Sequence, residues 1–465
     1  MHSTGVTMDG LTTQIARFVA QPGLDPLPAA AAHIIRSGFI DTIATMLAGR
    51  DEPVTRIMIE RVRAGRSAIA EASLLLGKEH ASAQDAALVN AAAGHALDYD
   101  DVALSGHPST VLAPAVLAEG EAIGASGAAV MRAYLVGYEV WAELIGRDAD
   151  SIHTKGWHPT GVFGTVAAAA AVANLRKLKV ETARHAIAIA ASMSSGLTAN
   201  FGTMTKPFHA GRAAANGIEA VRLAMAGLTA SADIFEHQGG FLHALSPNGT
   251  TDRNTPAVNL GKELALLENG LSIKKYPMCY ATHRVIDGML DLVTKHDIKA
   301  PDVDRVEATI GVPQAGMLRN HAPVTGLEAK FSLEFGVASA MVARKVGLAE
   351  LTDEFVNRAP VRDAMKRLSI STVDTRCPLE AGFSMHDRVV VRLKDGRKFD
   401  SGDIRFATGN AKVPLRDEEL RVKFMDCARG VQHLDPVTLF DRLSHLESVG
   451  NVAELVAIQA GKQAA

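Results

Sequence analysis

Apolar residues recur at intervals of three and four positions through most of the first half of the chain. This spacing predicts a succession of helices, separated by Gly, Pro and polar clusters. The helices are expected over residues 30–47, 86–96, 110–123, 128–144, 164–175 and 212–226. Many of their residues are Ala or Gly, which allow neighbouring helices to approach closely.

The pattern changes after a loop rich in Pro, Asn, Gly and Thr at residues 247–256. Residues 305–312 and 388–393 are rich in β-branched side chains, which favour strands. An Asp-Gly dipeptide follows the second run, so we expect a β-hairpin that continues over residues 397–403. Further helices are expected over residues 280–296, 333–346 and 356–367.

Residues 415–465 return to a helical pattern that resembles the first part in composition. We therefore predict a mainly α fold with two kinds of domain. A large all-helical domain takes residues 1–268, a smaller α+β domain takes residues 269–405, and residues 406–465 return to the helical domain.

Composition narrows the class of protein. The chain has 465 residues and a net charge of −3, which gives no electrostatic reason to expect nucleic acid or membrane binding. Its three cysteines are widely spaced, which excludes a disulfide framework and fits a reducing compartment. The N-terminus lacks the features of a signal peptide, and apolar stretches such as residues 162–173 are too short to span a bilayer. A soluble, cytoplasmic protein is expected.

Four polar stretches interrupt the Ala-rich helical sequence. They are HALDYDDVALSGHPST at residues 95–110, GWHPTG at 156–161, TKPFHAG at 205–211 and KKYPMCYATH at 274–283. Carboxylate, imidazole and ammonium groups are costly to bury. Their position at helix ends predicts one active site for a small anionic substrate.

The first stretch ends at the start of a helix. Ser109 or Thr110 can cap that helix, whose N-terminal amides would favour an anion beside His107. Asp98 is then close enough to orient the His107 imidazole. The simpler alternative is a capped helix with solvated aspartates, Asp100 and Asp101 among them. A metal site made of His95, Asp98, Asp101 and His107 is a further alternative, although the spacing matches no standard motif.

The second and third stretches add imidazoles and cations. His158-Pro159-Thr160 precedes an Ala-rich helix, so two imidazoles at helix starts can face carboxylate groups. Lys206, His209 and Arg212 cluster just ahead of another helix, where cations oppose the helix dipole unless an anion offsets them. A solvated basic loop is the alternative.

The fourth stretch lies at the proposed domain junction. Lys274 and Lys275 precede a helix that Cys279, Tyr280 and His283 enter, which predicts a substrate clamp on the smaller domain. A surface lysine pair is the alternative. Dinucleotide, Walker, GxSxG and HExxH motifs are absent from the sequence, so we expect acid/base chemistry on an anion without cofactor or metal.

The stretches together resemble the MmgE/PrpD family over nearly the whole chain. The resemblance rests on ALDYDD with GHPS, GWHPT, FGTMTKPFHAG, KKYPMCYATH, EAKFSLEF and GNAKVPLRDEEL, in that order. It implies a large helical domain, a smaller α+β lid domain, a homodimer and no organic cofactor. Its activities include 2-methylcitrate dehydration, cis-aconitate decarboxylation and iminodisuccinate epimerisation.

The resemblance also implies roles for single residues. The catalytic residues are expected to be Asp98, His107, His158, Lys206 and Lys274. The substrate di- or tricarboxylate is expected to bind Lys206, Lys274, Lys275, His209, Ser109 and Thr160.

Three positions depart from the pattern of the decarboxylase. Val102, Cys279 and Phe335 stand where a threonine, a histidine and a tyrosine are expected. All three changes remove polar groups, so an epimerase such as iminodisuccinate epimerase is the predicted function. A dehydratase acting on 2-methylcitrate is the alternative, followed by cis-aconitate decarboxylase and by an inactive metabolite-binding scaffold.

Overall fold

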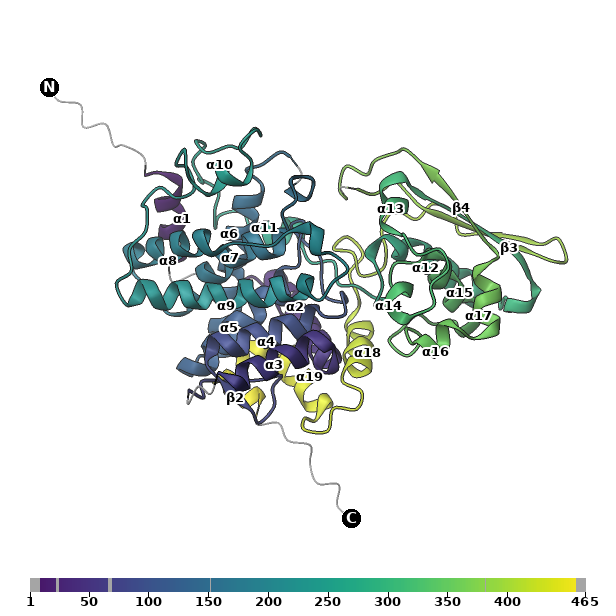
Figure 1. The fold of residues 1–465 in the computed structure, drawn as a ribbon, viewed down its shortest axis with the longest axis horizontal. Coiled ribbons are helices and arrows are strands. Elements are labelled where there is room, and N and C mark those ends of the chain that lie inside the picture. Colours follow the sequence, from purple (N-terminus) through teal and green to yellow (C-terminus); the bar gives the residue numbers. More distant parts are fainter. Residues whose placement is uncertain (1–8, 22–24, 66–68, 151, 381, 457–465) are drawn as a thin grey trace, which may run out of the picture. The chain divides into compact units, whose positions relative to one another are not determined.

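A computed structural model describes residues 9–21, 25–65, 69–150, 152–380 and 382–456. The chain divides into two compact units, one formed by Met1–Leu271 with Glu418–Ala465 and the other by Ser272–Asp417. The sequence prediction placed the two changes after residues 268 and 405. Helices dominate the described residues, so the predicted mainly α class is confirmed (Figure 1).

The first unit is built from long helices. They are α1 (Leu11–Val19), α2 (Ala29–Ala48), α3 (Pro53–Ala64), α4 (Ala83–His95), α5 (Pro108–Ile123), α6 (Gly127–Ile145), α7 (Pro159–Leu175), α8 (Val180–Met193), α9 (Thr205–Met225), the short α10 (Phe241–Leu245) and α11 (Ala265–Asn269), and the C-terminal α18 (Asp417–Cys427) and α19 (Pro436–Ser444). The prediction of an all-helical domain is wrong in one detail, because strands β1 (Ala72–Ser73) and β2 (His80–Ala81) form a small antiparallel sheet.

Small side chains let the central helices pack closely. Nearly every residue of α7 is buried, and α7 packs against α6 and α9. A Cβ atom added at Gly217 of α9 would lie 2.4 Å from the Cβ of Ala168 on α7. This separation would be a steric clash, so the close approach of the two helices requires glycine here. The Ala- and Gly-rich composition therefore sets the spacing of the helices that carry the polar stretches.

The C-terminal helices pack on elements from the start of the chain. Helix α19 lies against α2 (Figure 1). Arg36 on α2 forms an ion pair with Glu447, which follows α19, at 2.8 Å. The helical pattern after residue 415 therefore belongs to the first unit, in which Leu439 and Leu443 are fully buried.

The second unit contains a four-stranded sheet in the order β4-β3-β5-β6. Its strands are β3 (Val303–Gly311), β4 (Leu368–Val373), β5 (Arg388–Leu393) and β6 (Lys398–Asp400), and only β3 and β4 pair in parallel. The predicted hairpin is the β5–β6 pair. Strand β4 was not predicted, because it is an edge strand with no fully buried residue and little apolar pattern.

Helices pack around this sheet and supply much of the unit's core. They are α12 (His283–Lys295), α13 (Val312–Met317), α14 (Gly326–Ala329), α15 (Leu333–Ala343), α16 (Asp353–Val356) and α17 (Ala359–Met365). Gly288 on α12 leaves room for Ile404, because a Cβ there would lie 2.5 Å from the Cδ1 methyl of that residue. Among the helices of the described ranges, none is both long and apolar enough to cross a membrane.

Candidate active site

The loop between α4 and α5, residues 96–107, carries most of the candidate groups, and we call it the site loop. Asp98, Leu104 and Ser105 all have positive φ, at 52°, 49° and 57°. Non-glycine residues rarely adopt this left-handed conformation, and Asp tolerates it better than most because its short side chain can form local hydrogen bonds. Such strain concentrates at functional sites, and here it falls in the loop that carries the three aspartates of the first polar stretch.

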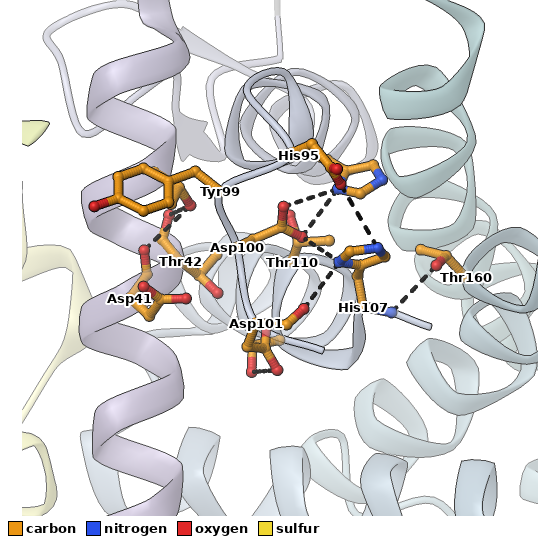
Figure 2. Close-up of polar contacts among 12 residues, drawn as sticks. Asp41, Thr42, His95, Tyr99, Asp100, Asp101, His107, Thr110 and Thr160 are labelled. Atoms are coloured by element: carbon orange, nitrogen blue, oxygen red, sulfur yellow. Dashed lines mark hydrogen bonds and ion pairs between the residues drawn. The ribbon is translucent and has the colours of Figure 1, made fainter. Parts of the chain in front are cut away.

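Asp100 lies at the centre of the polar cluster. Its two carboxylate oxygens each lie 2.9 Å from Nδ1 of His95, and Oδ2 lies 3.2 Å from Nδ1 of His107 (Figure 2). The carboxylate is fully buried between these two imidazoles. From the sequence, Asp100 appeared only in the alternative of solvated aspartates and His95 only in the alternative of a metal site, so neither was predicted as a member of this hydrogen-bond network.

The surroundings of His107 determine its tautomer. Nδ1 faces two acceptors, the Asp101 carbonyl oxygen at 2.9 Å and the Asp100 carboxylate. Nδ1 must therefore carry the hydrogen, which leaves Nε2 as the atom that can take up a proton. Nε2 lies 3.9 Å from Oδ1 of Asp98. Asp100, and not Asp98 as predicted, is the carboxylate that orients the ring.

In this cluster the His95 imidazole is neutral and the Asp100 carboxylate is ionised. Burial lowers the pKa of His95 to about 4, so that imidazole is neutral at pH 7 and donates to Asp100. Burial works to raise the pKa of Asp100, but the adjacent imidazoles of His95 and His107 hold it well below its usual range. The cluster therefore presents an ionised carboxylate to the imidazole of His107.

Asp101 faces away from this cluster and is part of a second buried group. Burial, with the nearby Asp41 and Asp100 carboxylates, raises its pKa well above the usual range. Its Oδ2 accepts a hydrogen bond from Ser109, whose hydroxyl lies 2.6 Å from that of Tyr134. The alternative of solvated aspartates is therefore wrong for Asp100 and Asp101, which are both fully buried.

The predicted helix caps are also wrong. Ser109 lies inside α5 and bonds Asp101, and Thr110 bonds the carbonyl of Ala91. The N-cap residue of α5 is His107, and that of α7 is His158, each followed by a proline at the first helical position. Both imidazoles thus lie at the positive end of a long helix, where an anion is stabilised.

Lys206 connects two of the polar stretches. Its Nζ lies 2.6 Å from Oδ1 of Asp98 and 5.3 Å from the ring centroid of Phe201. The residue lies in the first turn of α9, whereas the sequence analysis placed Lys206, His209 and Arg212 ahead of the helix; that start is corrected to Thr205. Arg212 donates to Asn216 on the same helix. The Asp98–Lys206 pair puts a cation and a carboxylate beside Nε2 of His107.

His158 forms a pair with another imidazole. Its Nδ1 lies 3.0 Å from Nδ1 of His209, so one ring donates and the other accepts. Burial, followed by the charge of Lys206, lowers the pKa of both histidines. Two neutral rings result, and His158 can exchange a hydrogen bond but does not carry a resident positive charge. His209 contacts His158, and Thr160 accepts the backbone N–H of His107 at 3.2 Å. Substrate binding by His209 and Thr160 stays a prediction.

One group among the described residues has the donors and spacing for a metal ion. It consists of His95, Asp98, Asp100 and His107, whose donor atoms lie within 4.8 Å of one another. The metal site considered from the sequence had Asp101 as its fourth ligand, whereas the structure has Asp100 in that place. The ammonium of Lys206 already pairs with Asp98, and a hydrogen between His107 and Asp100 already joins those two groups. These contacts favour proton chemistry, and catalysis without metal stays a prediction.

The fourth stretch lies in the second unit. The side chain of Lys274 is buried, and the ammonium of Lys275 lies 5.9 Å from the ring centroid of Tyr276. The alternative of a surface lysine pair is therefore wrong for Lys274, and the clamp role of both lysines stays a prediction. Phe335 is fully buried in the apolar core of this unit, with its ring against Phe355. It therefore belongs to the apolar core of this unit.

The neutral histidines predict acid-sensitive stability. Well above pH 6.5, His95 is neutral in both the folded and the unfolded protein, so it does not reduce the free energy of unfolding. Between pH 6.5 and 4, His95 takes up a proton in the unfolded chain but not in the folded protein, so the free energy of unfolding decreases as the pH falls. From pH 7 to pH 5 this residue alone should lower the free energy of unfolding by about 2 kcal/mol. Urea titrations followed by tryptophan fluorescence report on the first unit, because it contains both tryptophans, Trp141 and Trp157. A His95→Gln variant with an unchanged pH slope would contradict this.

The sequence is similar to known proteins over most of its length. A model of the MmgE/PrpD N-terminal domain matches residues 13–254, and one of the MmgE/PrpD C-terminal domain matches residues 276–438. The chain is 30% identical to cis-aconitate decarboxylase of Mus musculus, over 80% of this chain and 78% of the relative. Identity to cis-aconitate decarboxylase of Homo sapiens is 28%, over 81% and 79%. A cis-aconitate decarboxylase-like protein oryM of Aspergillus oryzae is 25% identical over 99% and 100%.

Proposed function

Because this chain belongs to the MmgE/PrpD family, as its motifs predicted, we propose that it is an enzyme that transfers a proton at a carbon next to a carboxylate of a small di- or tricarboxylate. The observation that carries this proposal is the environment of His107. Its Nδ1 hydrogen is held by the Asp101 carbonyl and the Asp100 carboxylate, so Nε2 can gain and release a proton. Lys206 and the N-termini of α5 and α7 supply positive charge for the substrate.

The first candidate reaction is decarboxylation of cis-aconitate, which is the activity in the names of the relatives. The bond between carbon and one carboxylate breaks, carbon dioxide leaves, and the electron pair stays on the carbon chain. That carbanion is stabilised by delocalisation and by nearby cations, and protonation from the His107 imidazolium completes an unsaturated dicarboxylate. Asp100 stabilises the imidazolium, as an ionised carboxylate does for a catalytic histidine.

Epimerisation of an iminodisuccinate-like substrate is the second candidate. Val102 and Cys279 stand where the decarboxylase pattern has polar residues, and proton transfer alone requires fewer polar groups than decarboxylation. Neutral His107 would remove the α-proton, and a group on the other face would return one. Dehydration of 2-methylcitrate would in addition require an acid for the departing hydroxyl.

Proton NMR in deuterium oxide separates these reactions. We expect purified enzyme to convert cis-aconitate into an unsaturated dicarboxylate with one solvent deuteron incorporated, at the same rate before and after dialysis against a strong chelator. Exchange of an α-proton of iminodisuccinate without net product would favour the epimerase. Replacement of the methyl doublet of 2-methylcitrate by an allylic methyl singlet would favour the dehydratase, because its product carries no hydrogen on the double bond. Activity lost on dialysis and restored by one divalent ion would place a metal at His95, Asp98, Asp100 and His107. Inertness toward all three acids would contradict the proposal.

A further inference from the structure

A buried lysine from the C-terminal part of the chain contacts the site loop. Lys423 of α18 has a side chain that is only 3% exposed. Its Nζ lies 2.6 Å from Oδ1 of Asp41 on α2 and donates a 2.8 Å hydrogen bond to the backbone carbonyl of Tyr99. One ammonium group thus joins α18, α2 and the site loop, all within the first unit.

The contact falls at a sensitive point of the site loop. Tyr99 lies between Asp98, the partner of Lys206, and Asp100, the partner of His107. The ammonium of Lys423 also lies 3.8 Å from the ring centroid of Tyr99, a cation–π distance, so it holds both the backbone and the side chain of this residue. A shift of the Tyr99 peptide would move the carboxylates on both sides of it, and Asp98 is already in a strained conformation.

The ammonium group of Lys423 is buried, and removing a charge from water costs free energy. Asp41 is fully buried, and burial raises the pKa of its carboxyl to about 6 although Lys423 acts in the opposite direction. A buried ion pair is seldom better for stability than well-packed apolar side chains. Packing alone therefore does not account for an ammonium at this place, whereas a donor for the Tyr99 carbonyl does.

We propose that Lys423 is a positioning residue for the reaction: by fixing the carbonyl of Tyr99 it holds Asp98 and Asp100 in place beside His107. The inference rests on the proposed function, since it assigns His107 the proton transfer. Lys423 itself does not touch the substrate. Its effect should therefore appear in kcat, while KM, which depends on groups such as Lys206, changes little.

Four variants test this. Lys423→Met/Asp41→Asn removes both charges and the donor to Tyr99, whereas Asp41→Asn alone keeps that donor. We expect kcat to fall ten- to hundredfold in the double variant and less than threefold in Asp41→Asn, with KM within threefold of wild type in both. Lys423→Met alone should have the lowest Tm, because it leaves the Asp41 carboxylate buried without its cation. Arg176→Met is the matched control: it removes one partner of the buried Glu119 on α5 and should lower Tm without lowering kcat.

The outcomes separate positioning from stability. A double variant with wild-type kcat would overturn the inference, as would Asp41→Asn with the same loss of kcat as the double variant. A crystal structure of the double variant provides a readout that needs no turnover: the 3.2 Å separation of His107 Nδ1 and Asp100 should lengthen. If wild-type enzyme turned over none of the tested acids, the proposed function would fail, while an unchanged Asp100–His107 geometry in this crystal structure would overturn the positioning role independently.

Discussion

Replacing His107 by asparagine should lower kcat by roughly two to four orders of magnitude, the range found for general acid–base groups. Asparagine can still donate toward the Asp101 carbonyl, so the site loop should keep its conformation while the group that exchanges the proton is lost. Binding should change much less, because the positive charges of Lys206 and the helix N-termini remain. Steady-state kinetics on cis-aconitate, with release of carbon dioxide as the readout, measures both effects.

His33→Asn is a suitable control for this substitution, since His33 is an exposed histidine on α2. It should leave kcat and KM at their wild-type values. If His107→Asn retained near-normal kcat and bound substrate weakly, His107 would be a carboxylate-recognition group, and the proton transfer would have to be assigned to another residue.

The Asp98–Lys206 pair should show two opposite responses. Lys206→Met removes a charge-assisted contact of roughly 1.5–3 kcal/mol, so binding of a dicarboxylate should weaken about ten- to hundredfold. Asp98→Asn should instead lower kcat about hundredfold without weakening binding, because the ammonium of Lys206 loses the carboxylate that competes with the substrate at 2.6 Å. Calorimetric titration with succinate and steady-state kinetics separate the two effects.

An exposed lysine at the start of α8, Lys179, provides the control for this pair. Lys179→Met should bind succinate as wild type does. Equal affinities of Lys206→Met and wild type would show that the anion site lies elsewhere, and weaker binding by Asp98→Asn would show that Asp98 supports the site and does not compete for Lys206. The corresponding role of Lys274, which lies in the second unit, stays a prediction.

Local patterns of the sequence determined most of the helical framework. Helical periodicity located α2 and α6 to within one residue at each end. The His-Pro dipeptides indicated that helices follow them, but α5 begins at Pro108 and α7 at Pro159, before the predicted starts at residues 110 and 164. These features depend on residues within a few positions of one another, because helical periodicity and proline geometry are local. Strand β4 escaped the sequence analysis because an exposed edge strand carries little apolar signal.

The motifs also indicated which polar residues belong to the site, but not which of them pair. Only the packing of α4, α5, α7 and α9 brings Lys206 to Asp98, 108 residues away in the sequence. The same packing makes Asp100 the partner of His107 and turns Asp101 toward a different buried group. Spacing along the chain cannot show which of three neighbouring aspartates contacts His107, because a positive φ at Asp98 changes the direction of the residues that follow.

The sequence by itself determined the fold class, the family and the polar stretches that supply the site. The tertiary structure decided the charge states and the partners: His95 is neutral because it is buried, His158 meets His209, and Lys423 reaches Tyr99 across 324 residues. The physical reason is that propensity and periodicity act over neighbouring residues, whereas desolvation and hydrogen bonding depend on which distant segments enclose a group.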